Sequence, residues 1–302
     1  MNKDLIAEIN KLKREKNAVI LAHCYQNVEI DEVADFVGDS LYLSRQAAKT
    51  SADIIVFAGV YFMAQTAKIL SPDKKVLLPV LKSGCRMADM ISLEQLREFK
   101  SKYESMPTVC YINSTAEVKS ECDICCTSSN AVDIVRSLNA KEILFVPDTY
   151  LGKYVESQLG DVKINTYPGF CPTHLMIRPE DIMSARKKYP NSVILAHPEC
   201  HNEVVKLADI VGSTSKIIKY AKESKDKSFI IATEKGVVDR LKRDCPNKEF
   251  ILIKENLICP NMKFNTLTDI YNSLKNEDYE INVDSEIASK ARKSIDRMLE
   301  VK

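Results

Sequence analysis

The sequence contains no tryptophan, and only eight glycines and four histidines among 302 residues. With no Gly- or Ser-rich stretch, it is neither a low-complexity chain nor one divided by flexible linkers. No apolar run approaches the roughly 20 residues that a membrane-spanning helix needs, so no membrane role is expected. Residues 1–16 are charged throughout and lack the apolar core of a secretory signal, which favours a cytoplasmic location.

Neither sign of charge is in excess. Lys and Arg number 43 against 42 Asp and Glu, which leaves a formal net charge of +1. Because no basic stripe stands out, nucleic acid is not an expected partner. Cysteine, in contrast, is plentiful, with ten copies. In a reducing compartment such cysteines indicate metal binding, catalysis or burial more readily than disulfides.

The chain repeats one unit three times, and each copy alternates helix-patterned segments with apolar strands. In every copy a residue at the end of the first strand precedes a hydroxyl residue by 17 positions. These pairs are His23 with Ser40, Tyr111 with Ser128, and His197 with Thr214. Each copy also ends in an apolar stretch that closes on a cysteine, 60 to 62 residues after the strand-end residue. The three cysteines are Cys85, Cys171 and Cys259.

Regular alternation of helix and strand is typical of parallel sheets covered by helices on both faces. We therefore predict an α/β protein of three homologous αβα domains with small parallel sheets, in a pseudo-threefold arrangement around a central active site. The predicted domains are residues 1–90, 91–176 and 177–265. Residues 266–302 are expected to form closing helices that pack back on the three domains.

The repeat also predicts a site. Functional groups of parallel α/β sheets gather at the carboxyl ends of the strands, so three domains about one axis would bring the three repeated cysteines into one cavity. Three thiolates favour a soft metal ion or an iron–sulfur cluster. With only three protein ligands, a [4Fe–4S] cluster keeps one iron open, and such an iron can act as a Lewis acid in dehydration.

Three polar runs, residues 38–40, 127–130 and 212–214, come just before helical stretches. Backbone N–H groups and a hydroxyl at a helix start can bind an anion, although Ser and Thr at such places also serve as ordinary helix caps. A substrate with carboxylates or phosphate is the functional interpretation. His174 follows Cys171 by three residues, so three of the four histidines fall near the predicted cavity. General acid or base chemistry by a histidine, a tyrosine or Glu199 fits this setting.

The other cysteines have simpler interpretations. Four isolated ones are expected to be buried small apolar residues, namely Cys24, Cys110, Cys200 and Cys245. The ECDICC run, with Cys122, Cys125 and Cys126, could bind zinc or act as a redox pair, but no second pair at ligand spacing accompanies it. Two alternatives therefore stand beside a three-cysteine enzyme. One is another iron–sulfur dehydratase of hydroxy acids, and the other is a non-catalytic metal-binding or redox-sensing protein built on ECDICC.

A set of motifs in fixed order resembles the quinolinate synthase (NadA) family over most of residues 17–265. They are ILAHCYQ, DFVGDSLYLS, YINST, CTSSNAV, GFCPTH, HPEC, VGSTSKI and ICPNMK. The resemblance implies a transferase of NAD biosynthesis that condenses iminoaspartate with dihydroxyacetone phosphate to quinolinate, with loss of phosphate and two waters. It also implies one [4Fe–4S] cluster per chain on three cysteine ligands, Cys85, Cys171 and Cys259, and suggests an L-aspartate oxidase or dehydrogenase as the supplier of iminoaspartate.

Site residues carry over from the same resemblance. The implied catalytic residues are Tyr25, Tyr111, His197 and Glu199. The implied substrate-binding residues are His23, Ser40, Met63, Asn113, Ser128, His174, Ser213 and Thr214. The chain departs from the family pattern at Cys24, where an asparagine or an aromatic residue is familiar. It also lacks the C-x-x-C-x-x-C run that some relatives carry near the last ligand, so no redox switch is expected after Cys259.

Overall fold

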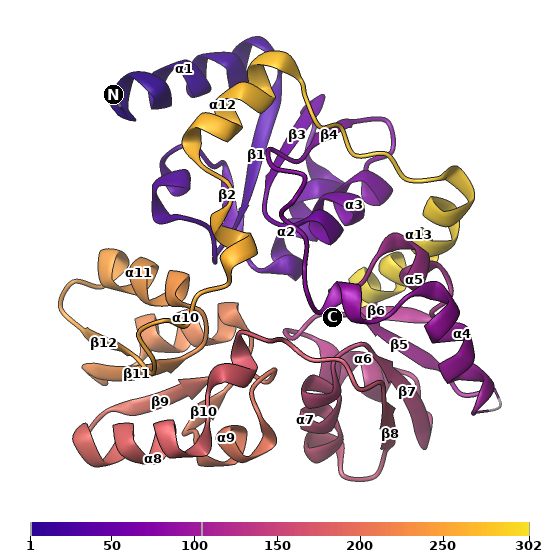
Figure 1. The fold of residues 1–302 in the computed structure, drawn as a ribbon, viewed down its shortest axis with the longest axis vertical. Helices are drawn as coiled ribbons and strands as arrows, with labels where there is room; N and C mark the ends of the chain where they lie inside the picture. The colour runs from indigo at the N-terminus through magenta and orange to yellow at the C-terminus, as the bar shows by residue number, and fades with distance from the viewer. Residues whose placement is uncertain (1, 104, 302) are drawn as a thin grey trace.

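The computed structural model describes residues 2–103 and 105–301. In this part of the chain, twelve strands form three sheets of four parallel strands, which surround a common centre (Figure 1). The strand orders are β2-β1-β3-β4, β6-β5-β7-β8 and β10-β9-β11-β12, so one topology occurs three times. The predicted α/β class with small parallel sheets is confirmed. The strands of each sheet fall within one predicted segment, while the domain bounds themselves stay a prediction.

The first sheet consists of β1 (Ala18–His23), β2 (Phe36–Gly38), β3 (Ile54–Ala58) and β4 (Lys75–Leu77). Its helices are α1 (Asn2–Glu15), α2 (Ser40–Lys49) and α3 (Tyr61–Leu70), with the short 3-10 helices η1 (Val28–Glu32) and η2 (Ala88–Met90). The apolar run of β3 is buried along its whole length because helices cover both faces of the sheet.

The second sheet consists of β5 (Thr108–Tyr111), β6 (Ile124–Cys126), β7 (Glu142–Val146) and β8 (Lys163–Thr166). Its helices are α4 (Leu93–Ser101), α5 (Ala116–Ser120), α6 (Ala131–Ser137) and α7 (Thr149–Leu159), followed by η3 (His174–Met176). Helix α4 begins at a capping box, in which Ser92 and Gln95 satisfy each other's backbone N–H groups. The local sequence thus sets where this helix starts.

The third sheet consists of β9 (Val193–Ala196), β10 (Ile210–Val211), β11 (Ser228–Ala232) and β12 (Glu249–Leu252). Its helices are α8 (Pro179–Lys188), α9 (Asn202–Leu207), α10 (Thr214–Glu223) and α11 (Lys235–Asp244), followed by η4 (Pro260–Lys263). Proline stands at the first position of α8, where its missing N–H costs no helical hydrogen bond.

The last two helices leave the third domain and return to the other two (Figure 1). Helix α12 (Leu267–Asn276) lies against α1 and β3, where Ile270 and Leu274 join the core of the first domain. Helix α13 (Ser285–Glu300) packs on α5 and β6 of the second domain. The predicted closing helices therefore cover two of the three domains. No described helix combines the length and the apolar character needed to cross a bilayer.

Candidate active site

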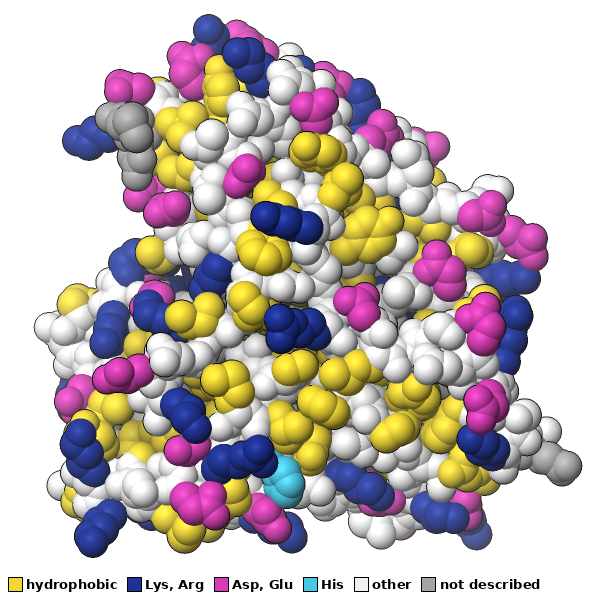
Figure 2. All heavy atoms as spheres, viewed as in Figure 1, with side chains coloured by type: hydrophobic (Ala, Val, Ile, Leu, Met, Phe, Trp, Pro, Cys, Tyr) yellow, Lys and Arg dark blue, Asp and Glu magenta, His cyan; other side chains and the backbone are white. Residues whose placement is uncertain are grey.

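A cavity of about 360 Å³ lies where the three domains meet. On the face of the molecule in Figure 2, apolar side chains gather toward the middle, while Lys, Arg, Asp and Glu are most frequent at the edge. The cavity is lined by residues from the carboxyl ends of all three sheets, as expected for parallel α/β domains. All but one of the predicted site residues line it, namely His23, Tyr25, Ser40, Met63, Cys85, Tyr111, Asn113, Ser128, Cys171, His174, His197, Glu199, Thr214 and Cys259.

The exception is Ser213. Its hydroxyl caps α10 by accepting the backbone N–H of Lys216 over 3.3 Å, and it is not among the residues that line the cavity. Ser40 is the first residue of α2, behind the capping Asp39, and Ser128 lies three residues before α6. The cap interpretation therefore fits Ser213, while the hydroxyls of Ser40 and Ser128 belong to the cavity wall.

One backbone contact, made identically in each domain, brings the three cysteines to the cavity. The first residue of the helix after the third strand donates its N–H to the carbonyl two residues before the cysteine. These bonds join Tyr61 to Ser83 over 2.8 Å, Thr149 to Gly169 over 2.9 Å, and Lys235 to Leu257 over 2.9 Å. The regular spacing seen in the sequence thus arises from three equivalent loops, each anchored at a helix start.

The three cysteines form a donor set suited to a cluster. All three are free and partly buried. Burial raises the pKa of Cys85 to about 12, and its thiol also interacts electrostatically with that of Cys259. Thiols in such a place need a positive centre to ionise.

A single ion would be held by a different group. In the described part of the chain, only Cys171, His174 and Glu199 bring three ligand atoms within 4.8 Å of one another. The three repeated cysteines are spaced more widely, which suits a cluster whose ligands bind separate irons. The residues present therefore fit a three-cysteine iron–sulfur cluster.

Glu199 is the centre of a buried hydrogen-bond network. Its carboxylate accepts a hydrogen bond from the phenol of Tyr111 and lies 2.8 Å from Nδ1 of His174. Burial alone would raise the pKa of Glu199, but the imidazoles of His197 and His174 and the hydrogen bonds from His174 and Tyr111 outweigh it and lower that pKa. The ring of His197 stacks on that of His174, with centroids 4.6 Å apart. The network thus joins side chains of the second and third domains.

His23 and His197 occupy equivalent strand ends, and each makes the same kind of backbone hydrogen bond. Nδ1 of His23 accepts the N–H of Tyr25 over 3.1 Å, and Nδ1 of His197 accepts the N–H of Glu199 over 3.3 Å. Burial lowers the pKa of His23 to about 4 and that of His197 to about 3. Both imidazoles are therefore neutral at physiological pH and carry their proton on Nε2.

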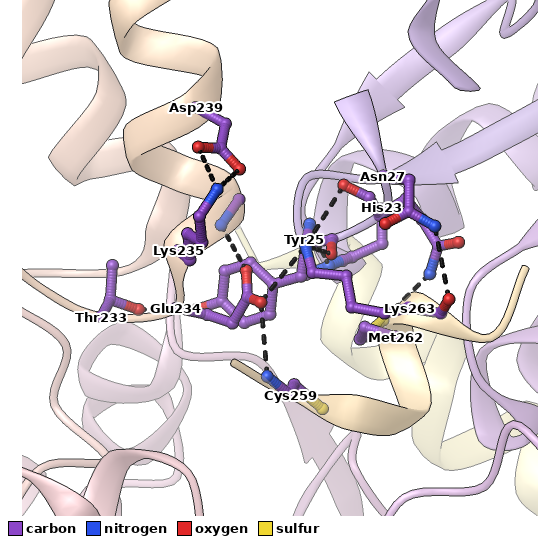
Figure 3. Close-up of polar contacts among 12 residues, drawn as sticks. His23, Tyr25, Asn27, Thr233, Glu234, Lys235, Asp239, Cys259, Met262 and Lys263 are labelled. Atoms are coloured by element: carbon purple, nitrogen blue, oxygen red, sulfur yellow. Dashed lines mark hydrogen bonds and ion pairs between the residues drawn. The ribbon is translucent and has the colours of Figure 1, made fainter. Parts of the chain in front are cut away.

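Tyr25 is held mainly by the third domain. Its phenol lies 2.9 Å from the hydroxyl of Thr233 (Figure 3). The same phenol accepts a hydrogen bond from Thr214 over 3.0 Å. Thr233 also lies 2.8 Å from Nε2 of His174. Burial raises the pKa of Tyr25 well above its usual value, so its phenol keeps its proton. Thr233 is thus a shared partner of two predicted site residues.

Asn113 offers an open hydrogen-bond acceptor to the cavity. Its Oδ1 atom is buried and finds no hydrogen-bond partner within the residues that the structure describes. Buried polar atoms are seldom left unpaired, and each exception points to strain or to a missing partner. A donor group on a bound ligand would satisfy this atom.

The sequence did not single out Thr233 and Glu234, which follow β11 directly. Glu234 lines the cavity, and its carboxylate accepts the N–H of Cys259 over 3.3 Å. Their position in the repeat could have identified them. They are the two residues after β11, and residues 59–60 and 147–148 hold the equivalent positions after β3 and β7. Residue type differs at all three, so comparing side chains alone misses the equivalence.

The ECDICC run is not part of the cavity wall, although Thr127, the residue that follows it, lines the cavity. Cys125 and Cys126 belong to β6 and are fully buried, and burial raises the pKa of both thiols. Cys122 donates to the carbonyl of Val118 over 3.2 Å. Within the described residues, none of the three belongs to a group of ligand atoms close enough to hold an ion. These observations favour a structural role for the run.

Known proteins are similar in sequence to this chain over nearly its whole length. The family model described as quinolinate synthetase A protein matches residues 7–300. The chain is 54% identical to the quinolinate synthase of Alkaliphilus metalliredigens over 99% of both chains. It is 52% identical to quinolinate synthase 2 of Methanosarcina acetivorans, over 100% of this chain and 97% of the relative. The quinolinate synthase of Caldicellulosiruptor saccharolyticus is 51% identical over 97% of both chains. These matches confirm the resemblance carried by the motifs, and the chain belongs to the quinolinate synthase family.

Proposed function

We propose that this chain forms quinolinate in NAD biosynthesis by condensing iminoaspartate with dihydroxyacetone phosphate, with loss of phosphate and two waters. The observation that carries the proposal is the meeting of Cys85, Cys171 and Cys259 with the Glu199 network in one cavity, in a chain of this family. The names of the relatives support the same activity.

The proposed cofactor is one [4Fe–4S] cluster per chain, held by the three repeated cysteines. When bound, it would supply a Lewis-acidic iron with an open coordination position. The chain's own contribution is to place three thiols from three domains around one cavity by equivalent backbone contacts. The cluster and the substrates would therefore share a space that no single domain encloses.

Both proposed substrates are anions, and the cavity wall offers groups that recognise them. Ser40 and Thr214 stand at the first positions of α2 and α10, where N–H groups and the helix dipole favour negative charge. Ser128 and Asn113 add a hydroxyl and an unpaired amide oxygen, and Met63 adds apolar wall. We propose that these residues bind and orient carboxylate, phosphate and amine groups.

Proton transfer is assigned to the polar network. Glu199 is ionised and accepts hydrogen bonds, so it suits the role of base, with Tyr111 and His174 as the groups that pass protons to and from it. The neutral His23 and His197 carry their proton on Nε2, so each can donate a hydrogen bond from that atom to a ligand in the cavity. Tyr25 keeps its phenolic proton and can donate it to a developing negative charge.

The iron and sulfide content of anaerobically prepared protein tests the cluster. Wild type should contain about four of each per chain, as a [4Fe–4S] cluster does. Alanine at Cys85, Cys171 or Cys259 should abolish both the cluster and quinolinate formation. Cys245→Ala is the matched control, because this partly exposed cysteine lies at the end of α11, outside the cavity lining.

The same assay separates the alternatives. Zinc in place of iron, or iron that survives Cys171→Ala but not Cys125→Ala, would refute the three-cysteine site and favour a site on ECDICC. A cluster with no quinolinate formation from iminoaspartate and dihydroxyacetone phosphate would leave another dehydratase of hydroxy acids. Because iminoaspartate is unstable, an L-aspartate oxidase or dehydrogenase added to the assay is the proposed source.

A further inference from the structure

A buried carboxylate lies directly behind Cys259. Glu234 is fully buried and caps the start of α11, where its side chain accepts the N–H of Gly236 over 2.6 Å. Its other oxygen accepts the N–H of Cys259 over 3.3 Å (Figure 3). One carboxylate thus fastens the backbone of the last repeated cysteine to the start of a helix.

Lys263 neutralises this carboxylate and reaches the first domain. Its ammonium lies 3.2 Å from Glu234 and donates to the backbone carbonyl of Tyr25 over 2.5 Å. On the other side, Asn27 donates to the backbone carbonyls of Lys263 and Asn265, over 3.3 Å and 2.9 Å (Figure 3). The ion pair therefore joins the loop that carries Cys259 to the loop that carries Tyr25.

Tyr25 is therefore held through both its side chain and its backbone. Its phenol meets Thr233, the residue just before Glu234, and its carbonyl meets Lys263. Gly236 adds a close approach, since a Cβ there would lie 2.8 Å from the carbonyl oxygen of Cys24 and 3.0 Å from Cα of Tyr25. Glu234 and Lys263 thus connect the backbone of Cys259 to the backbone of Tyr25.

The other two domains lack this arrangement at the equivalent places. Val60, just before α3, has no charged group, while Asp148, just before α7, uses one carboxylate oxygen to accept the N–H of Leu151. The pair of Glu234 and Lys263 is therefore an addition to the third unit and not a requirement of the repeated fold.

We propose that Glu234 and Lys263 are a positioning pair that couples metal binding at Cys259 to ligand binding at Tyr25. The proposal rests on the proposed function, since it takes Cys259 as a cluster ligand and Tyr25 as a substrate contact. Coupling between two sites is reciprocal in binding free energy, so a ligand in the cavity should tighten iron binding by the same factor by which the cluster tightens the ligand. Slower loss of iron in the presence of ligand is the expected sign of this coupling. The pair is the physical link that carries this effect.

Because Glu234 and Lys263 form an ion pair, a second substitution can compensate for the loss of the first, and this makes the proposal testable. Removing only Lys263 leaves a buried carboxylate without its cation, which is strongly unfavourable, whereas removing both charges avoids that cost. Lys263→Met should therefore release iron to a chelator of the order of tenfold faster than wild type. The double variant E234Q/K263M should recover at least half of that change on a logarithmic scale, and Lys263→Arg should stay close to wild type.

The experiment measures the first-order rate of iron release from anaerobic holoenzyme, with and without saturating quinolinate as the probe. Quinolinate should slow release in wild type and lose that effect in Lys263→Met. The matched control is Asp239→Asn, which breaks the more exposed Lys235–Asp239 pair on the same helix (Figure 3). This control should behave as wild type.

Two results would overturn the proposal. One is equal release from Lys263→Met and Asp239→Asn, and the other is a double variant E234Q/K263M that loses iron faster than Lys263→Met. Because E234Q/K263M and Lys263→Arg are both expected to fold and retain iron, a misfolded Lys263→Met would not remove the test. Wild type without any cluster would instead refute the proposed function, so the two failures are distinguishable by iron content alone.

Discussion

Tyr111, at the end of β5, donates its phenolic hydrogen bond to Glu199, which follows β9 in another domain. Both side chains are buried, and the same carboxylate also lies against His174. A hydrogen bond to a charged acceptor inside a protein is among the stronger ones. Because this bond joins two domains, the proposed acid–base chemistry depends on how those domains are placed relative to each other.

Tyr111→Phe should therefore lower quinolinate formation by about 10²-fold or more, the usual effect of losing a general acid or base group. The reason is that the Glu199 carboxylate loses the hydrogen bond from the phenol, so the pKa of Glu199 rises. Iron content should not change, because the cysteines are untouched. Tyr154→Phe is the control, since Tyr154 lies on α7 outside the cavity lining. Full activity in Tyr111→Phe would exclude the phenol from proton transfer.

His23 should make the metal-free protein sensitive to acid. Burial lowers the pKa of His23 from 6.5 to about 4, partly opposed by the nearby Asp39. Between these two values the unfolded chain binds a proton that the folded chain does not, so the free energy of unfolding falls as pH falls from about 6.5 to about 4. At roughly 1.4 kcal/mol per pKa unit, the loss from His23 is on the order of 3 kcal/mol.

Urea unfolding at steps between about pH 7 and 4.5 measures this dependence. His23→Gln should flatten the curve by the share that His23 contributes. His201→Gln is the control, because the side chain of His201 is partly exposed, at 31%. A slope that is the same in wild type and His23→Gln would mean that Nδ1 of His23 accepts a proton in the folded protein despite its contact with the N–H of Tyr25.

The cavity could be predicted from sequence because equal spacing in an α/β repeat places equal positions at the carboxyl ends of strands. Intervals of 17 and of 60 to 62 residues were enough to find three cysteines and three hydroxyl residues that line one cavity. Spacing alone does not reveal a site residue where residue type changes between units, as at Glu234, whose equivalents are Val60 and Asp148. The interval of 17 residues selects Thr214 and not its neighbour Ser213, a helix cap that was expected at the site only from the family resemblance.

The sequence also did not reveal which domains the last two helices, α12 and α13, pack against. Their apolar stripes predict packing, but they have no counterpart elsewhere in the repeat that would fix a partner. In the structure α12 covers the first sheet, and the segment between the helices bonds to the edge of that sheet, where Ile281 donates to Val76 over 2.8 Å. The distribution of such helices among domains depends on long-range contacts that local sequence does not encode.

Gly236→Ala should destabilise the seam between the first and third domains. The added Cβ would meet the backbone of residues 24 and 25 within 3.0 Å, and backbone cannot move as a flexible side chain can. Overpacking of this kind costs about 1–3 kcal/mol. Gly84→Ala is the control for stability, since the nearest atom to its new Cβ would be a carboxylate oxygen of Asp89 at 3.7 Å. Equal urea midpoints for the two variants would contradict the close approach.

Lys119 should stabilise the contact between the first and second domains. It is fully buried, and its ammonium donates to the carbonyl of Ser114 over 2.6 Å and to the hydroxyl of Thr66 over 3.1 Å. The same ammonium lies 5.2 Å from the centre of the Phe62 ring, which lines the cavity. Burial lowers the pKa of Lys119, and the hydrogen bonds to Ser114 and Thr66 offset part of the cost of burying its polar head.

Lys119→Ala should lower the free energy of unfolding by about 3 kcal/mol, since it leaves a cavity and an unpaired buried carbonyl. Lys119→Met keeps most of the volume and removes a buried charge, so its loss should be nearer 1 kcal/mol. Lys290→Ala, at an exposed site on α13, is the control and should unfold as wild type. If methionine were as damaging as alanine in urea unfolding, the hydrogen bonds of the ammonium, and not the space it fills, would be what joins the two domains.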